Sequence, residues 1–387
     1  GTFTYKGDRG KHTLQISESM NVATSIDGGT AFETVDTGSG RKSVFDIISN
    51  IINSINNISV GLSTNLHGGW LMGAEQVALH KSAESINRVL LLSDGNANVG
   101  LRDVNEFKIQ CSRLAETNVT TSTYGLGYQF NEELMVSMAG SGLGHSYYGQ
   151  TSNDLMDPFT EEFETLVNTV ASQIKVKSEN PTFVNCNLMN NYNIIQSSQE
   201  SIVFNLPDLA ENGTAWSLFK LKINQQNIAN EEIEVLRCNI SYTDIDGNSK
   251  NKGPVKIVLK PVNENAFAAI AENEKVRIRI TEINVARFQE QAREAARIGD
   301  WAMTDFYISE ARKEAKDHEW LNSVLDSLEV YAKAKKSEQF SKEAMYSSDK
   351  MNKRLVSNDE INMRYDYDIE SDKEAYLRRK MERGRKF

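Results

Sequence analysis

The sequence predicts several domains: an α/β domain with a mostly parallel sheet, an antiparallel β-sandwich into which it is inserted, and a C-terminal α-helical hairpin or bundle. Three observations indicate this architecture. Strand-like and helical patterns alternate from residue 20 to residue 178, which is typical of a doubly wound parallel sheet covered on both faces. Short alternating segments replace them up to residue 263, and charged helical patterns follow. The length of 387 residues also exceeds what one core usually holds.

The first 19 residues contain two short strand candidates, residues 2–6 and 12–17, in which apolar and polar residues alternate. They precede the first strand of the α/β domain, expected over residues 20–27. Farther along that domain, isoleucines recur at helical spacing and predict a helix with one buried stripe. These residues are Ile47, Ile48, Ile51, Ile52 and Ile55.

Residues 179–263 lose the helical periodicity. Short apolar runs are separated there by Asn-Gly, Asp-Gly and Pro signals, which is typical of an antiparallel sandwich. We expect residues 1–19 to complete this domain, because two isolated strands are only marginally stable. The stretch from Asp244 to Asn248 resembles a calcium loop but lacks the terminal Glu and flanking helices. It therefore predicts a hairpin turn.

The helical region is expected over residues 264–336. Gly299 suits a helix end and Asp300 the next N-cap, so residues 266–297 and 301–316 form a hairpin. A third helix covers residues 318–336. Residues 337–387 have little apolar content and end in a basic run, which indicates a charged tail that is a solvated helix or disordered. Four side chains should face the preceding helix, namely Trp301, Phe306, Tyr307 and Ala311.

The chemistry of the α/β domain is concentrated where an apolar run ends at Asp94. Ligands of open α/β sheets bind beyond the carboxyl ends of the strands, so Asp94 lies where a site residue is expected. Upstream, Ser63 and Thr64 belong to a hydroxyl-rich loop that opens onto a helical pattern over residues 71–80. A carboxylate and a hydroxyl from neighbouring loops suit a hard cation such as Mg²⁺.

Together these motifs resemble the von Willebrand factor A (VWA) domain. That family builds a metal-ion-dependent adhesion site from an Asp-x-Ser-x-Ser loop, a Thr and an Asp; Thr64 matches the second element and Asp94 the third. The resemblance covers roughly residues 20–175, and the downstream region extends it to bacterial multidomain VWA proteins. In related proteins a β-sandwich precedes and follows the VWA domain, which implies the discontinuous domain expected here.

The first metal loop departs from the family. Asp27 matches the leading Asp, but Gly29 and Ala31 stand where the pattern has serines. Too few residues follow Asp27 for the helix of a parallel crossover. Two interpretations remain open: Asp27-Gly28-Gly29 is a hairpin turn, or the chain lacks a segment after Asp27 that the family has.

Composition favours a cytoplasmic protein. No apolar run approaches the roughly 20 residues that cross a bilayer, and no signal peptide opens the sequence. The three cysteines are scattered, which argues against a disulfide framework or zinc site. The formal net charge of −10 disfavours nonspecific nucleic-acid binding.

The sequence shows no convincing catalytic motif. The five histidines show no zinc-binding spacing, and His67 is expected to be a loop hydrogen-bonding residue. The glycine-rich residues 140–144 lack the Lys-Ser/Thr of a phosphate loop and precede a strand. Asp103 and Glu106 are expected to be solvated acids in the first turn of a helix.

The resulting hypothesis is a non-enzymatic binding or scaffolding module. The resemblance implies Mg²⁺ or Mn²⁺ held by Asp27, Thr64 and Asp94, with an open position for a partner's carboxylate. Bacterial VWA proteins often work beside AAA+ ATPases or in stress and defence systems, so it also implies a protein partner. The sequence leaves the oligomeric state open. Two alternatives remain: a structural assembly protein with a degenerate metal site, and a metal-assisted hydrolase, which the missing general base disfavours.

Overall fold

A computed structural model of the chain describes residues 13–17, 20–23, 35–36, 41–42, 44–57, 63–81, 86–211, 213–224, 231–353 and 356–357. The chain divides into two compact units, residues 1–62 and 63–387. Each unit is described by itself. Within the described residues, no helix is both long and apolar enough to span a membrane.

The first unit contains two strand pairs and a helix. Strand β1 (Thr13–Ser17) pairs antiparallel with β2 (Met20–Ala23), and β3 (Val35–Asp36) pairs with β4 (Arg41–Lys42). Helix α2 (Val44–Asn56) follows and contains the isoleucines that predicted it, but the expected buried stripe was wrong, because Ile48, Ile51, Ile52 and Ile55 are exposed. Pairing of residues 1–19 with the antiparallel domain stays a prediction.

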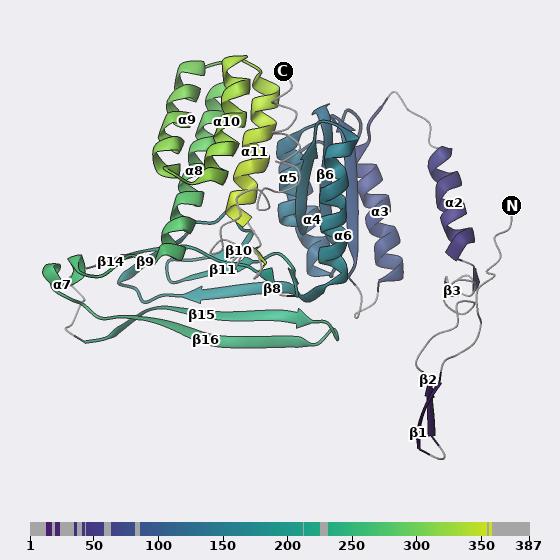
Figure 1. The fold of residues 1–387 in the computed structure, drawn as a ribbon, viewed down its shortest axis with the longest axis horizontal. Coiled ribbons are helices and arrows are strands. Elements are labelled where there is room, and N and C mark those ends of the chain that lie inside the picture. The colour runs from purple at the N-terminus through teal and green to yellow at the C-terminus, as the bar shows by residue number, and fades with distance from the viewer. Residues whose placement is uncertain are drawn as a thin grey trace. The chain divides into compact units, whose positions relative to one another are not determined.

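The second unit begins with a parallel sheet of three described strands, which confirms the expected α/β domain (Figure 1). Its order is β5 (Arg88–Gly95), β6 (Thr120–Gln129) and β7 (Leu143–Gly149). Helix α4 (Val104–Glu116) connects β5 to β6, and helix α5 (Glu132–Ser141) connects β6 to β7. Parallel strands need such helical crossovers.

Helices cover both faces of this sheet. On one face, the Trp70 indole of α3 (Leu66–His80) donates to the Thr121 hydroxyl at 3.1 Å. On the opposite face, Ser122 donates to Glu162 of α6 (Met156–Val167) at 2.5 Å. Because neighbouring residues of a strand point to opposite faces, α3 and α6 lie on opposite sides of β6. Trp70 and Phe107 are fully buried in the core beneath the first face.

Two boundaries differ from the expected ones. Helix α3 begins at Leu66 instead of residue 71, because the Asn65 side chain caps it by accepting from the Gly68 amide at 2.9 Å. The helical pattern of residues 158–174 predicts a longer helix, but α6 ends at Val167 and strand β8 (Thr169–Glu179) occupies the rest. Residues 173–177 alternate between polar and apolar, which favours a strand.

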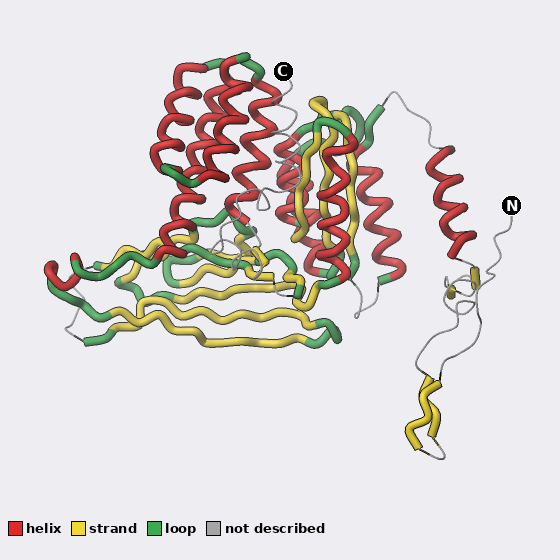
Figure 2. The backbone as a smooth tube through the Cα atoms, in the orientation of Figure 1, coloured by secondary structure: helices red, strands yellow, loops and turns green. Residues whose placement is uncertain are grey.

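The antiparallel region consists of two sheets that share one core (Figure 2). The larger sheet has the order β10-β11-β8-β15-β16, with β12 beside β8, and the smaller one pairs β9 with β14. Phe204 and Val176 of the larger sheet pack with Leu188 and Phe219 of the smaller one. This two-layer packing partly supports the expected sandwich. The remaining bounds are β9 (Val184–Leu188), β10 (Ile194–Ser197), β11 (Ser201–Asn205), β12 (Leu209–Ala210), β14 (Phe219–Ile223), β15 (Ile233–Asp244) and β16 (Ser249–Leu259).

The turn from Asp244 to Asn248 joins β15 to β16, which confirms the hairpin. The Asp244 carboxylate accepts from the Asp246 and Asn248 amides at 3.1 and 2.8 Å. Its oxygen is thus used to close the turn. The shorter elements are η1 (Ser152–Leu155), α7 (Glu264–Ala268), and β13 (Gly213–Thr214), which pairs with β17 (Val356–Ser357).

Four helices form the C-terminal bundle, α8 (Glu274–Arg297), α9 (Trp301–Ala315), α10 (Glu319–Lys333) and α11 (Ser337–Lys353). Gly299 has a φ of 77°, and Asp300 caps α9 by accepting from the Met303 amide, as the sequence predicted. Trp301, Tyr307 and Ala311 pack in the bundle core. The expectation for Phe306 was wrong, because its side chain is 50% exposed.

The bundle extends beyond residue 336, the expected start of a charged tail. Helix α11 buries Phe340, Ala344 and Met351 completely. These apolar residues are few, but their spacing puts them on one face of a helix, so low overall apolar content did not prevent packing.

Candidate functional site

The carboxyl end of β5 brings two of the three predicted site residues into neighbouring loops. Asp94 lies one residue before the end of β5 and is exposed. Thr64 lies two residues before α3, and its carbonyl accepts from the Asn98 and Val99 amides at 3.1 and 3.2 Å. The Asn98 side chain accepts in return from the Thr64 amide at 2.7 Å. The loop after Asp94 is therefore bonded directly to Thr64.

The Thr64 hydroxyl lies close to the end of β5. A Cβ atom added to Gly95 would lie 3.7 Å from the Thr64 hydroxyl oxygen. This places the hydroxyl near the residue that follows Asp94, and the role of both residues as metal ligands stays a prediction. Asp27 lies outside the described residues. We call the loops around Thr64, Asp94 and Asn98 the rim.

The rim residues suit a hard cation by type but are few. A hydroxyl and a carboxylate are oxygen donors, which Mg²⁺ and Mn²⁺ prefer. Among the described residues, no group of three or more His, Cys, Asp and Glu could hold a metal ion. Two protein donors bind Mg²⁺ weakly because the ion retains its waters. A tight site therefore needs further donors from the first loop.

A third loop borders the rim that sequence reasoning did not identify. Gln129 at the end of β6 pairs with Gly95. The next residue, Phe130, lies across β6, where a Cβ on Gly125 would come within 2.2 Å of its ring. The glycine is needed for this close approach. Its position between Tyr124 and Leu126 in a strand was the available signal.

The other residues of the α/β domain that the sequence singled out have structural roles. The His67 ring nitrogen lies 2.8 Å from Gln110 Oε1, as expected of a loop hydrogen-bonding residue. Asp103 caps α4 by accepting from the Glu106 amide at 2.9 Å. Residues 140–144 form the turn from α5 into β7, so the strand expected after the glycine-rich run is confirmed.

A buried ion network that the sequence did not reveal lies on the α6 face of the sheet. Arg88 of β5 contacts Glu162 at 2.8 Å and Asp208 at 2.5 Å, and the three side chains are at most 3% exposed. Asp208 follows β11, so the network ties the parallel sheet to the antiparallel domain. No pattern in the sequence links these distant residues.

The network has no catalytic geometry. Glu162 accepts from Ser122 at 2.5 Å and from Tyr147 at 2.9 Å, and its other close neighbour is His145 at 2.9 Å. Burial opposes ionisation of Glu162, but His145 and Arg88 outweigh it and hold its pKa well below the usual range. Ser122 donates to the carboxylate, so the His145 ring does not activate it as a base would.

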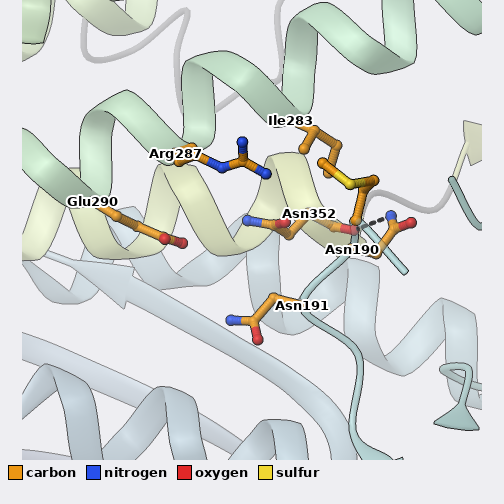
Figure 3. A pocket seen from close by; sticks show the side chains of 7 residues that line it. Asn190, Asn191, Ile283, Arg287, Glu290 and Asn352 are labelled. Carbon is orange, nitrogen blue, oxygen red and sulfur yellow. Dashed lines mark hydrogen bonds between the residues drawn. The ribbon is translucent and has the colours of Figure 1, made fainter. Parts of the chain in front are cut away.

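A polar pocket of about 240 Å³ lies between α8, α11 and the loop before β10 (Figure 3). Arg287 and Glu290 of α8 face it beside Asn191, and all three are exposed. Asn190 is already engaged, because it donates to the Asn352 carbonyl at 2.8 Å and accepts from the Leu218 amide. The two buried asparagines that line it, Asn190 and Asn352, are both hydrogen bonded within the chain, because Asn352 donates to the Ser348 carbonyl at 2.9 Å.

Comparison with known proteins identifies the fold. No protein family model matches the chain. It is 32% identical over 133 residues to the uncharacterized protein YfbK of Escherichia coli, a match that covers 34% of this chain and only 23% of that protein. A von Willebrand factor type A structure from Catenulispora acidiphila matches 83% of this chain and 78% of its own, with 14% identity and a TM-score of 0.61. The ArnB paralog VWA2 from Sulfolobus acidocaldarius gives a TM-score of 0.46 at 17% identity, over 76% of this chain and 70% of its own.

The likeness to the Catenulispora structure shows that the chain carries the von Willebrand factor A fold, as the motifs indicated. The parallel sheet with helices on both faces is its α/β part, and a helical bundle follows. Thr64 and Asp94 therefore lie at the sheet edge where such folds bind ligands.

Proposed function

We propose that the chain is a protein-interaction module that captures a partner at the rim. The proposal is supported by the fold and by one observation: the Thr64 loop is hydrogen bonded to the loop that follows Asp94. These bonds hold the Thr64 loop next to the exposed Asp94 at the end of β5. A binding role accounts for this arrangement.

The proposed ligand is a carboxylate of a protein partner, bound through Mg²⁺ or Mn²⁺. Asp27, Thr64 and Asp94 would hold the ion, which supplies positive charge to an anionic partner group. Asp27 and Asp94 would contribute the negative charges that retain the cation and Thr64 a neutral oxygen, so the partner's carboxylate would bind through an open coordination position on the ion. An AAA+ ATPase in a bacterial stress or defence system is the kind of partner we propose.

A reducing compartment fits this role. Cys111, Cys186 and Cys238 are all free thiols, and burial raises the pKa of Cys111 to about 12, which makes it inert. We therefore place the module in the cytoplasm.

The test is capture with and without metal. The bait is the chain and a variant with the family's serines, Gly29→Ser with Ala31→Ser, each probed in Mg²⁺ and in chelator. We expect the variant to retain a partner only in Mg²⁺ and to lose it on Asp94→Ala. Asp246→Ala is the matched control, because Asp246 is an exposed aspartate in the distant β15–β16 turn. If the amount of partner retained is the same in chelator and with Asp94→Ala, the proposal is contradicted.

A second candidate is a structural assembly protein whose metal site is degenerate. It is favoured by Gly29 and Ala31 in place of the serines. That function predicts metal-independent association that survives Asp94→Ala and responds instead to changes in the bundle or the antiparallel domain.

A further inference from the structure

The helical bundle is hydrogen bonded to the loop that borders the rim, at Phe130 and Glu132. Lys342 of α11 is only 3% exposed, and its ammonium donates to the Phe130 carbonyl at 2.7 Å and to Glu132 at 3.0 Å. The same nitrogen lies 4.2 Å from the centre of the Phe130 ring. A buried ammonium is stable only with such partners. Lys342 is therefore fixed to one loop of the α/β domain.

A second buried cation acts on the same carboxylate. Arg293 of α8 is 8% exposed and lies 3.3 Å from Glu132. Burial opposes ionisation of Glu132, but Lys342 chiefly, and Arg293 as well, lower its pKa below the usual range. The first turn of α5 is thus held from two helices of the bundle at once.

The loop that contains Phe130 is adjacent to the rim. Phe130, whose carbonyl accepts from Lys342, directly follows Gln129, and Gln129 pairs with Gly95. Gly95 in turn follows Asp94. The connection from α11 to Asp94 therefore consists of one side-chain hydrogen bond, the Gln129–Phe130 peptide, one strand pairing and the Asp94–Gly95 peptide.

We propose that the bundle sets the conformation of the rim through Lys342, which acts as a positioning residue. Loss of the Lys342 ammonium frees the Phe130 carbonyl and leaves Glu132 with one cation, so the loop loses its fixed position. Gly95 and Asp94 then also lose their fixed positions, because Gly95 pairs with Gln129 of that loop. Binding at the rim and docking of α11 on α5 favour each other reciprocally. The part of this inference that concerns ligands rests on the proposed function.

Amide hydrogen exchange of the chain tests the coupling without any ligand. Lys342→Met keeps the length of the side chain and removes its charge. We expect exchange of residues 126–131 and 93–99 to rise about tenfold, the size of a typical coupling between sites, while α9 and α10 stay protected. Lys353→Met is the control: Lys353 is also on α11, but it pairs with Asp349 and lies near Gly140 at the far end of α5.

Metal affinity tests the consequence separately. In the Gly29→Ser, Ala31→Ser background, Lys342→Met should weaken Mg²⁺ binding about tenfold, and Lys353→Met should leave it unchanged. If that background binds no Mg²⁺, the proposed function fails, and the exchange result alone decides the coupling. If Lys342→Met does not fold, Glu132→Gln decides in the same way. Unchanged exchange at residues 93–99 in a folded variant overturns the inference.

Discussion

At the residue scale, Arg88 is expected to contribute strongly to the free energy of unfolding. Its guanidinium neutralises two carboxylates in a water-excluded junction. Removal of one partner from a buried ion cluster leaves the others uncompensated. Arg88→Met should therefore lower the free energy of unfolding by about 3–5 kcal/mol, measured by urea denaturation. Arg88→Lys, which keeps the charge, should lose less, and a Met variant as stable as the parent contradicts this role.

Glu162 predicts an acid-sensitive junction. Its pKa in the folded chain lies below the ordinary value of 4.5. The ionised carboxylate therefore stabilises the fold above about pH 4.5, and this contribution is lost as the pH falls toward the lower folded pKa. Burial raises the pKa of Asp208, so that residue has the opposite effect.

Glu162→Gln should consequently lose less stability than the parent between about pH 5 and pH 2. Urea midpoints measured across that range check the prediction. Glu164→Gln, an exposed change on the same helix, should keep the parental pH dependence. Parallel curves for Glu162→Gln and the parent exclude a depressed pKa at Glu162.

At the element scale, helix ends with strong local signals were predictable and others were not. Gly299 and Asp300 fixed the α8–α9 corner, because a left-handed turn and an N-cap depend on those two residues alone. The end of α6 depended on competition between a helix and β8, a central strand of a sheet whose other strands come from distant parts of the chain, which local patterns do not contain. Helix α11 was missed because the bundle supplies its stability.

The α8–α9 hairpin gives a direct test of packing. Trp301 is half-buried and meets the Phe340 ring edge-on at 6.4 Å, whereas Phe306 on the same helix is largely exposed. Trp301→Ala should cost about 2 kcal/mol of stability, less than a fully buried aromatic. Phe306→Ala should cost about 0.5 kcal/mol or less. Equal melting temperatures for the two variants argue against this assignment of faces.

At the scale of the whole molecule, the fold class followed from sequence, and so did the proximity of the Thr64 loop to the loop after Asp94. Strand patterns followed by Ser-Asp-Gly and Ser-Thr-Asn predicted the parallel sheet and placed Thr64 beside the loop after Asp94. The Arg88 network and the Lys342 contact were unpredictable, because each joins residues more than seventy positions apart through tertiary packing.

The position of residues 1–19 remains a proposal at this scale. If they complete the antiparallel domain, their deletion should raise amide exchange along an edge strand of the larger sheet, β10 or β16. Strands β5 to β7 should stay protected. Unchanged exchange along both edges contradicts the discontinuous domain.

The most direct test of the central claim is a calorimetric titration of Mg²⁺ and Mn²⁺ into the chain and into the Gly29→Ser, Ala31→Ser variant. Because Thr64 and Asp94 are too few donors alone, we expect little or no specific binding by the chain. The variant should bind either ion, and Asp94→Ala should abolish that binding while leaving the fold intact. Tight binding by the unaltered chain, or binding by the variant that survives Asp94→Ala, contradicts the assignment of the rim as the metal site.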